Sequence, residues 1–362
     1  MGAALPLPHA DTAAEPAVVV LRAPATAEIV PAWDDLAANA LEPNPFYESW
    51  MLRPALEFLA AGDDVRLVTV WEQGRLSALL PVKRGTPFVR LRNWRHRHCL
   101  LGTPLVRADG AARHVAALVE WLRKQAALVT LDYLPADGPV YRLLAKAGLP
   151  TQSHERALFR RSRDADTYLA TAASRHDRQE VRRRVRRLAE RGAVAHVALR
   201  ADEPVERWID ELLALEAGGW KGEQGSALAC SEANRRFARE IFAAAHRRGR
   251  LQIVGLDLDG RPLARCSSIL AQSGGYAFKT AYDEAFARYA PGIIVELDRI
   301  RALHEAPVEW MDSYTDAGNT VLNRLWNERV SIGGVVFANP ILLKARRWLR
   351  RLSSAPARGS AA

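Results

Sequence analysis

The stretch of the sequence best equipped for chemistry joins the end of a strand to the start of a helix. Phe278–Tyr282 has strand-like alternation, and Asp283 and Glu284 follow in a turn. An apolar helix begins at Pro291-Gly292, with Arg288 just upstream. The N–H groups and dipole of a helix start attract anions, and glycine lets a ligand come close to the backbone. The pattern therefore indicates a phosphate site, although a helix capped by proline has the same sequence without any ligand.

Acidic residues stand at the ends of two expected strands, where a catalytic base could lie. Asp283 and Glu284 follow the first strand, whereas Asp312 ends a strand expected over residues 308–312. A carboxylate on a loop can accept a proton from an attacking nucleophile or bind a cationic substrate. Each of the three could instead cap its own turn, and the sequence leaves both interpretations open.

Three further residues are candidates for substrate binding. Trp220 and Lys221 follow a helix break at Gly218-Gly219, and Tyr314 follows Asp312 on a loop. A tryptophan ring can stack on a sugar, and a lysine can bind a phosphate or a carboxylate. Large aromatic residues are also ordinary core residues, so packing is the competing interpretation for Trp220.

A run of arginines covers a helix expected over residues 174–191. Val181, Val185 and Leu188 form its apolar stripe, and the arginines occupy the remaining positions. Because no aromatic residue is interleaved to stack on bases, nucleic acid is the least favoured partner. We expect a solvated helix, with contact to an acidic substrate or a phosphate as the second interpretation. The arginines are Arg175, Arg178, Arg182, Arg183, Arg184, Arg186, Arg187 and Arg191.

Composition limits the class of protein. The chain has 362 residues, of which 49% are hydrophobic and 25% charged, as in a globular protein of two domains. Neither an apolar run long enough to span a membrane nor a signal peptide is expected. The three cysteines form no CxxC pair, so we expect no metal site, no disulfide framework and a reducing cytoplasm. The net charge of +10 indicates either an anionic partner or a general preference for arginine.

The elements that must position these residues are predicted by periodicity and turn chemistry. In the first part, strands are expected over 18–21, 65–71, 76–82, 88–91, 100–106, 129–134 and 157–159, and helices over 33–41, 46–59, 111–126 and 140–147. In the second part, strands are expected over 194–199, 251–258, 263–270, 276–282, 308–312 and 332–337, and helices over 166–172, 174–191, 206–217, 231–248, 292–305 and 322–329.

The order of helix, antiparallel hairpin, further strand, helix and strand occurs about twice. We therefore predict an α/β fold with mixed, mainly antiparallel sheets in two successive halves, residues 17–160 and 161–340. Residues 1–16 are expected to form a loose tail. Residues 341–362 contain a basic amphipathic segment, Leu342–Leu352, which could either pack as a terminal helix or rest on an anionic membrane.

An ordered set of short motifs in the second half resembles a known family. The set resembles the GNAT-superfamily acyltransferases called CelD-like or BioF2-like, which are associated with cellulose and other exopolysaccharide synthesis. Those are distant relatives of the FemABX peptidyltransferases, which consist of two GNAT halves. The resemblance is strongest over residues 174–337. The motifs are Trp208, Leu215–Ala227, Gly249-Arg250-Leu251, Asp259–Ala264, Tyr276–Lys279, Tyr282-Asp283-Glu284 and Pro291-Gly292.

The resemblance implies a substrate pair and a place for each. The donor would be acyl-CoA, most simply acetyl-CoA, and the acceptor an amine or a sugar amine, with no metal. Backbone N–H groups along a splayed strand, at Lys279, Thr280, Ala281 and Tyr282, would polarise the thioester carbonyl. The pyrophosphate would lie on the loop and helix start formed by Arg288, Tyr289, Ala290, Pro291 and Gly292.

Two other functions stay open at this point. One is a FemABX-like transferase that takes its acyl group from aminoacyl-tRNA. The other is a non-catalytic binding subunit of a polysaccharide-synthesis complex. Turnover of acetyl-CoA would separate an acyl-CoA-dependent transferase from both of these alternatives. A cytoplasmic enzyme, with residues 342–352 able to touch the inner face of the membrane, is our expectation for location.

Overall fold

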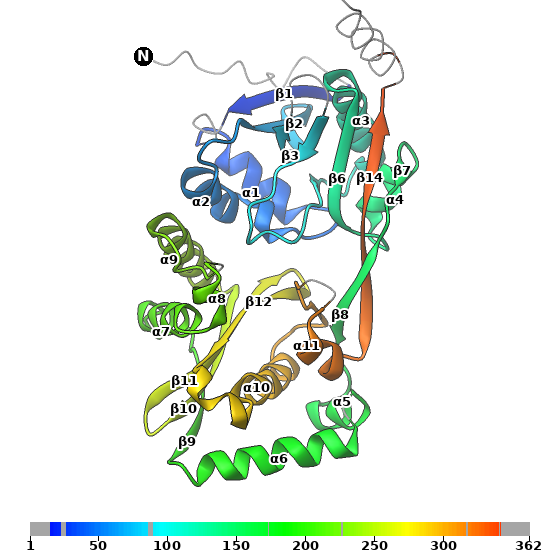
Figure 1. Cartoon of the computed structure of the whole chain (residues 1–362). Coiled ribbons are helices and arrows are strands. Elements are labelled where there is room, and N and C mark those ends of the chain that lie inside the picture. The colour runs from blue at the N-terminus through cyan, green and yellow to red at the C-terminus, as the bar shows by residue number, and fades with distance from the viewer. Residues whose placement is uncertain are drawn as a thin grey trace, which may run out of the picture. The chain divides into compact units, whose positions relative to one another are not determined.

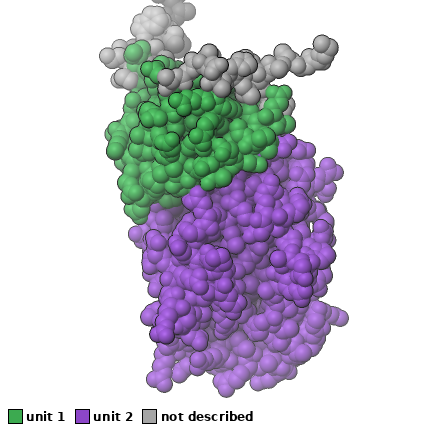
Figure 2. Space-filling model, turned by 180° about the vertical axis from the view of Figure 1, so that it is seen from behind, with its two compact units in different colours: residues 1–42, 62–153, 333–362 green, residues 43–61, 154–332 purple. Residues whose placement is uncertain are grey.

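The computed structural model describes residues 15–22, 27–85, 90–172, 174–225, 227–315, 318–339 and 341. The predicted basic segment at 342–352 lies outside these residues. Two compact units make up the chain (Figure 2). Unit 1 comprises residues 1–42, 62–153 and 333–362, and unit 2 comprises 43–61 and 154–332. No helix in the described part of the chain is long and apolar enough to cross a membrane.

Unit 1 is a mixed sheet whose hairpins are set by turn residues. Gln73 and Gly74 both have positive φ, as the tight turn between β2 and β3 requires. Neighbouring strands are antiparallel from β1 to β4, whereas β4 and β6 pair in parallel. The strand order is β1 (Ala17–Arg22), β2 (Val65–Glu72), β3 (Arg75–Arg84), β4 (Arg90–Asn93), β6 (Leu128–Pro135) and the end of β14 (Glu328–Ala338).

The helices of unit 1 bury one face each. In α3 (Ala111–Gln125), Val115, Leu118, Val119 and Leu122 are spaced three or four residues apart and are all buried. The other helices are α1 (Val30–Ala38) and α4 (Pro139–Ala145), and two short strands, β5 (Leu105–Val106) and β7 (Leu149–Pro150), lie off the main strand order.

The strands of unit 2 also pair in a mixed arrangement. The hairpin between β10 and β11 turns at Asp259-Gly260, again with positive φ at both residues. Pairing is antiparallel except between β12 and β13, which run parallel. The strand order is β9 (Val194–Ala198), β10 (Leu251–Leu258), β11 (Arg261–Ala271), β12 (Gly274–Tyr282), β13 (Trp310–Asp312), β8 (His154–Arg160) and the start of β14.

Helices cover both faces of the sheet in unit 2. Successive side chains of a strand point to opposite faces. On β11, Arg265 meets Glu211 of α7 (Glu206–Ala217), whereas Cys266 meets Glu296 of α10 (Pro291–Glu305). Figure 1 shows α7 and α10 on opposite sides of the sheet. The other helices are α2 (Ser49–Leu59), α5 (Ala165–Ala172), α6 (Arg175–Ala189), α8 (Trp220–Glu223), α9 (Glu232–Arg247) and α11 (Thr320–Leu325), with 3₁₀ turns η2 (Pro45–Tyr47) and η3 (Glu284–Tyr289).

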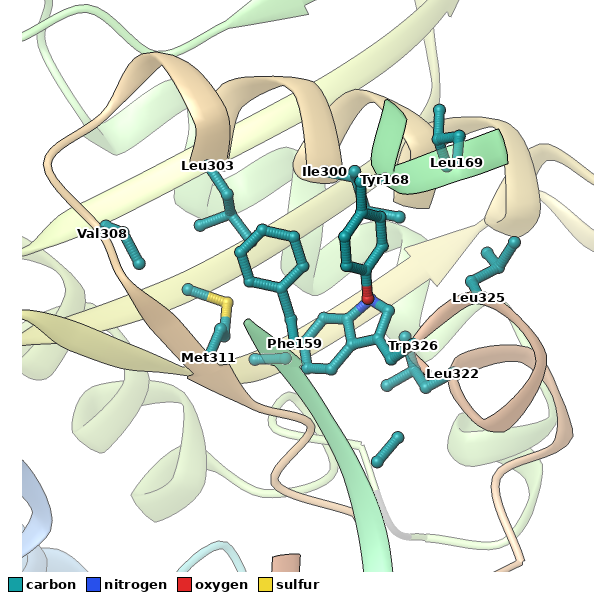
Figure 3. Packing of buried hydrophobic residues seen from close by; sticks show 12 residues of the cluster. Phe159, Tyr168, Leu169, Ile300, Leu303, Val308, Met311, Leu322, Leu325 and Trp326 are labelled. Atoms are coloured by element: carbon teal, nitrogen blue, oxygen red, sulfur yellow. The ribbon is translucent and has the colours of Figure 1, made fainter. Parts of the chain in front are cut away.

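An apolar cluster holds β8, α5, α10 and α11 together. Phe159 lies against the rings of Tyr168 and Trp326, at centroid distances of 4.8 and 6.0 Å (Figure 3). Ile300 and Leu303 of α10 and Met311 of β13 complete its buried part. The cluster fixes α10 against β13, and so fixes one border of the region where chemistry is expected.

The two units repeat one order of elements. Unit 1 follows β1, α1, β2, β3, β4, α3, β6, α4, and unit 2 follows β9, α7, α9, β10, β11, β12, α10, β13, α11. The α/β fold, the mixed and mainly antiparallel sheets and the duplicated order are therefore confirmed. The compact units do not follow the expected halves, because Pro43–Ala61 and β8 contribute to unit 2 and residues 333–338 contribute to unit 1.

Three expected elements differ in the structure. The helix expected over 322–329 ends at Leu325, and Glu328 begins β14, because Glu328–Ile332 pairs with β8. The strand expected over 100–106 shrinks to β5. The helix expected over 46–59 is divided between η2 and α2, with Glu48 in extended conformation between them.

Candidate active site

The parallel pairing of β12 with β13 is short. It joins Gly274–Tyr276 to Trp310–Asp312 and ends at Tyr276, whereas β12 keeps its ladder with β11 as far as Tyr282. A bulge at Phe278 interrupts that ladder, because Ala277 and Lys279 face consecutive residues of β11. Lys279, Thr280, Ala281 and Tyr282, the expected carbonyl-binding residues, therefore lie just past the point where β12 and β13 part, which we call the unit 2 fork.

The helix start expected to bind phosphate comes directly after these residues. Asp283 caps η3, since its carboxylate accepts the N–H of Ala285 at 3.0 Å. Ala290 has left-handed φ and ψ of 53° each, and Pro291 begins α10. Gly292 is tightly approached: a Cβ added there would lie 3.1 Å from Cδ1 of the Tyr282 ring. Glycine at 292 therefore makes room for the Tyr282 ring, which lies against the first turn of α10.

The flanking residues of the turn are less enclosed. Arg288 is exposed, and its guanidinium lies 4.8 Å from the centre of the Tyr289 ring, which is buried. An exposed arginine beside a helix start suits contact with a phosphate. The cofactor-binding assignments of Arg288 to Gly292 remain predictions.

Lys279 is tied to the α7 side of the sheet. Its ammonium lies 3.2 Å from the carboxylate of Glu216, which is buried and also accepts the N–H of Leu228 at 2.7 Å. The Lys279 side chain thus fixes β12 to α7, and only its backbone is placed to serve a donor.

The opposite face of β12 meets a buried polar network that the sequence analysis missed. Arg299 donates to the Thr280 hydroxyl at 3.0 Å and lies 3.4 Å from Glu296. Trp326 donates its indole N–H to Glu296 at 3.1 Å. Burial raises the pKa of Glu296, and it raises the pKa of the Cys266 thiol beside this network to about 12. The available signal was the spacing of Glu296 and Arg299, which lie three residues apart on the face of α10 that carries Val295, Ile300 and Leu303.

Asp312 lies in a different environment from Asp283. Its carboxylate accepts a hydrogen bond from Arg156 at 2.6 Å, both side chains being buried, and it accepts the N–H of Tyr314 at 2.9 Å. Tyr314 has a φ of 52° and stacks on Phe46 at 4.3 Å. Because Asp312 is buried and its carboxylate is held by Arg156 and by the Tyr314 N–H, this geometry favours a structural function for Asp312.

An acidic cavity of about 490 Å³ adjoins Asp283. Glu284 lies close to the helix break at Gly218-Gly219, between α7 and α8. A Cβ added at Gly219 would lie 2.8 Å from the Glu284 carboxylate. Trp220 and Lys221 begin α8 after this break, and their side chains are outside the description. Asp283, Glu284 and the break are therefore brought together. The other residues that line the cavity are Asp210, Glu211, Ala214, Leu215, Gly218 and Pro262.

Unit 1 has a corresponding fork, where β4 and β6 part after Arg92 and Thr130. This fork is filled by residues of unit 1. The Asn93 side chain donates to the carbonyl of Asp132 at 2.9 Å and accepts its N–H at 3.0 Å. Gly102 donates its N–H to Tyr133 at 2.8 Å. A Cβ added at Gly102 would lie only 2.0 Å from the Asp132 carbonyl oxygen. Nothing larger than glycine fits at position 102, so segments of unit 1 itself close this fork.

Comparisons with known proteins agree with this fold. Residues 175–320 match the family model described as an acetyltransferase (GNAT) domain. No curated protein matches the chain. The solved structure of FemX is 12% identical, with a TM-score of 0.56, over 87% of this chain and 98% of that one. The C-terminal domain of a protein described as a lysylphosphatidylglycerol synthetase from Agrobacterium fabrum is 15% identical, with a TM-score of 0.55, over 92% and 99%.

A conserved protein from Bacteroides thetaiotaomicron VPI-5482 is also similar, at 13% identity and a TM-score of 0.54, over 85% of this chain and 97% of that one. At these identities the likeness concerns the fold, and the fold is that of GNAT acyltransferases. The resemblance to GNAT proteins expected from the motifs is thus confirmed, whereas the CelD-like or BioF2-like type stays a prediction. Among the described residues, no group of three potential metal ligands occurs.

Proposed function

We propose that the chain is an N-acyltransferase that moves an acyl group from a CoA thioester to an amine, with unit 2 as its catalytic unit. The observation that carries the proposal is the contrast between the two forks. In unit 1 the space is taken by Gly102 and Asn93, whereas in unit 2 the strand leads past the fork into a turn and a helix start. The GNAT match over residues 175–320 covers that second fork.

The proposed donor position rests on the chain's own groups. The backbone of Lys279–Tyr282 would hold the thioester carbonyl, and the turn from Arg288 to Gly292 would hold the pyrophosphate. Rotation of the Tyr282 ring would uncover the first turn of α10, which makes donor binding a conformational step.

The acceptor would enter by the acidic cavity. Asp210 and Glu211 are paired with Arg239 and Arg265, so Asp283 would attract the protonated amine, and Asp283 or Glu284 would take up the proton that leaves the nitrogen. The neutral amine attacks the carbonyl carbon, the C–N bond forms, and the C–S bond breaks. The sulfur leaves with the electron pair and becomes the thiol of CoA on protonation.

The wider function is also a proposal. The motif resemblance over residues 174–337 supports a sugar amine or glycan acceptor in exopolysaccharide or cell-envelope synthesis. The alternative, transfer from aminoacyl-tRNA, is supported by the likeness in fold to FemX, and a non-catalytic binding subunit is the third possibility.

Thiol release from acetyl-CoA in the presence of glucosamine tests the proposal directly. We expect turnover by the native chain, and loss of CoA binding in Gly292→Val. The matched control is Gly318→Val, because a Cβ at Gly318 meets no atom within 4 Å. Both variants are checked for native circular dichroism. Turnover only with aminoacyl-tRNA would favour the second function, and binding of glycans without any turnover would favour the third.

A further inference from the structure

A large groove separates α6 from α10 within unit 2. Its volume is about 1290 Å³, and α5, α11 and β9 also contribute to its walls. The proposed acyl transfer uses none of its residues. The groove is therefore available for another ligand.

The rim of the groove is strongly cationic. Arg175, Arg182 and Arg186 are exposed, and none of them has an ion-pair partner among the described residues. Offsets of 7 and 11 residues place them on one stripe of the helix, about 16 Å long. Arg178 adds a further guanidinium group, whereas Arg183 and Arg301 are paired with Glu180 and Asp298, and Asp166 is the carboxylate among the lining residues.

The floor of the groove is apolar. It is formed by aliphatic side chains from four helices, and none of the residues that line the groove has a phenyl or indole ring. The imidazole of His196, which is paired with Asp298, is the aromatic ring among these lining residues, so a nucleic acid would find charge but little surface for stacking. An anionic molecule with a hydrocarbon part would match both surfaces. The floor residues are Leu169, Ala170, Val181, Val185, Ile294, Leu297 and Leu325.

We propose that this groove binds an anionic phospholipid, with its phosphate on Arg182 and Arg186, which lie one helical turn apart, and its acyl chain along the floor. Guanidinium groups without partners form charge-assisted hydrogen bonds to phosphate oxygens. Contact with the aliphatic floor removes the acyl chain of the lipid from water, which favours binding. The groove lies apart from the acidic cavity, which would repel the same ligand.

Calorimetric titration of the full chain with dihexanoyl phosphatidylglycerol, kept below its micelle concentration at 150 mM salt, tests the proposal. We expect saturable binding. Glycerol 3-phosphate, which carries the charge without the chain, and dihexanoyl phosphatidylcholine, which carries the chain without net charge, should both bind much more weakly. Equal affinity for glycerol 3-phosphate would overturn the proposal in favour of a simple anion patch.

Variants separate the groove from general charge. Arg182→Gln with Arg186→Gln should weaken lipid binding about tenfold or more, since two charge-assisted contacts are lost. Arg235→Gln with Arg236→Gln is the matched control, because these arginines pair with Glu232 on α9, outside the groove. Unchanged affinity in the first variant, or an equal loss in the second, would contradict the proposal.

Two competition experiments decide between ligand classes. Acetyl-CoA should leave lipid binding unaffected, and displacement would show that the groove belongs to the donor site instead. Transfer RNA should bind weakly at 150 mM salt; tight binding that Arg182→Gln with Arg186→Gln destroys would make this groove a nucleic-acid surface. Acyl transfer by that variant stays unchanged if both proposals hold, so failure of one is distinguishable from failure of the other.

Discussion

The two forks of this molecule show how one topology can be bordered by very different side chains in its two copies. Both units have a parallel pair of strands that separates after three residues, β4 from β6 and β12 from β13. In unit 1 the gap is closed by Asn93 and by Gly102, at a position where no larger residue fits. In unit 2 the same position is bordered by aromatic rings and a buried ion pair. The sheets are alike in this respect, and the difference lies in the segments that border each fork.

The forks nevertheless share a strained corner. Tyr133, which follows Asp132 in β6, has a φ of 60°. Tyr314, two residues after Asp312, has a φ of 52°. Each ring has an arginine over it, Arg95 at 3.7 Å and Arg156 at 5.6 Å. A bulky residue with positive φ costs roughly 1–3 kcal/mol and persists where the surroundings enforce it. The shared corner is therefore a residue-level trace of the duplication.

The largest effect is expected on turnover, when the proposed catalytic base in unit 2 is replaced. Whichever of Asp283 and Glu284 is the base, its amide variant should lose roughly 10²–10⁴-fold in turnover, because proton transfer in the transition state is lost. Donor affinity should not change. Asp137→Asn, in the turn after β6 of unit 1, is the control and should keep full turnover. If both Asp283→Asn and Glu284→Gln stay active, another group must receive the proton.

The next effect concerns stability, and it compares Asp312 of unit 2 with Asp132 of unit 1. Asp312→Asn should destabilise the chain by about 3–5 kcal/mol in urea unfolding, because it leaves the buried Arg156 charge without its partner. Asp132→Asn should cost far less, since Asp132 forms no ion pair with any described residue. A stable Asp312→Asn chain that turns over roughly 10²–10⁴-fold more slowly would instead restore the catalytic function expected from the sequence.

Adding a methyl group to each fork sharpens the contrast. Gly102→Ala should destabilise unit 1 by about 1–3 kcal/mol, because the new Cβ meets backbone that cannot move aside. CoA affinity should stay unchanged, in contrast to Gly292→Val. Thermal unfolding and CoA titration on the same samples make this measurement. Loss of CoA binding in Gly102→Ala would place the donor in unit 1 after all.

Unit 1 also carries the clearest dependence on pH. Burial raises the pKa of Glu42 from 4.5 to about 7, against the opposing effects of the Val140 N–H, Arg142 and Thr103. The folded chain thus keeps a proton that the unfolded chain releases between pH 4.5 and 7. Stability should therefore fall as pH rises through this window, by about 3 kcal/mol at most, and stay low above about pH 7.

Glu42→Gln tests this, because an amide does not titrate. Urea unfolding at about pH 5 and about pH 8, on either side of the window, should give a smaller difference for the variant than for the native chain. Equal pH dependence in both proteins would show that another group is responsible. Acyl transfer assayed at one fixed pH should be the same for both, since the residue belongs to unit 1.

The smallest effect is expected on α6. Arg183→Gln, Arg184→Gln and Arg187→Gln together should leave acyl transfer to a small amine almost unchanged, because Arg183 and Arg184 are engaged with Glu180 at the surface. The measurement is turnover beside a tRNA titration at two salt concentrations. Saturable tRNA binding that the triple variant loses, with a steep dependence on salt, would support the aminoacyl-tRNA-dependent function instead.

Local patterns predicted most elements because those elements are amphipathic or bounded by turn residues. The stripe of α3 and the glycine turns of both hairpins are visible in a short window. Elements that depend on distant partners were not predictable in this way. Glu328 was placed in a helix because β8, its partner, lies about 170 residues earlier.

The candidate site was predictable only in part for the same reason. The strand, turn and helix start from Lys279 to Gly292 were correctly located, but their contacts were not. Neither the Arg156 partner of Asp312 nor the Tyr282 ring on Gly292 leaves a local pattern. The buried pair Glu296 and Arg299 did leave a local pattern, as two charged residues on the apolar face of α10. That this pair belongs to the site became clear only from the contact of Arg299 with Thr280.

The way the chain is shared between the units has a consequence for its synthesis. Unit 1 takes residues 333–338 of β14, which pair with its strand β7, so a chain emerging from the ribosome cannot complete its first unit until these residues are made. Unit 2 likewise needs α2, made near the beginning, to cover α9. Contacts so distant in sequence are slow to form. A nascent chain would thus carry two unfinished sheets at once, and a stop codon shortly before β14 would leave neither complete.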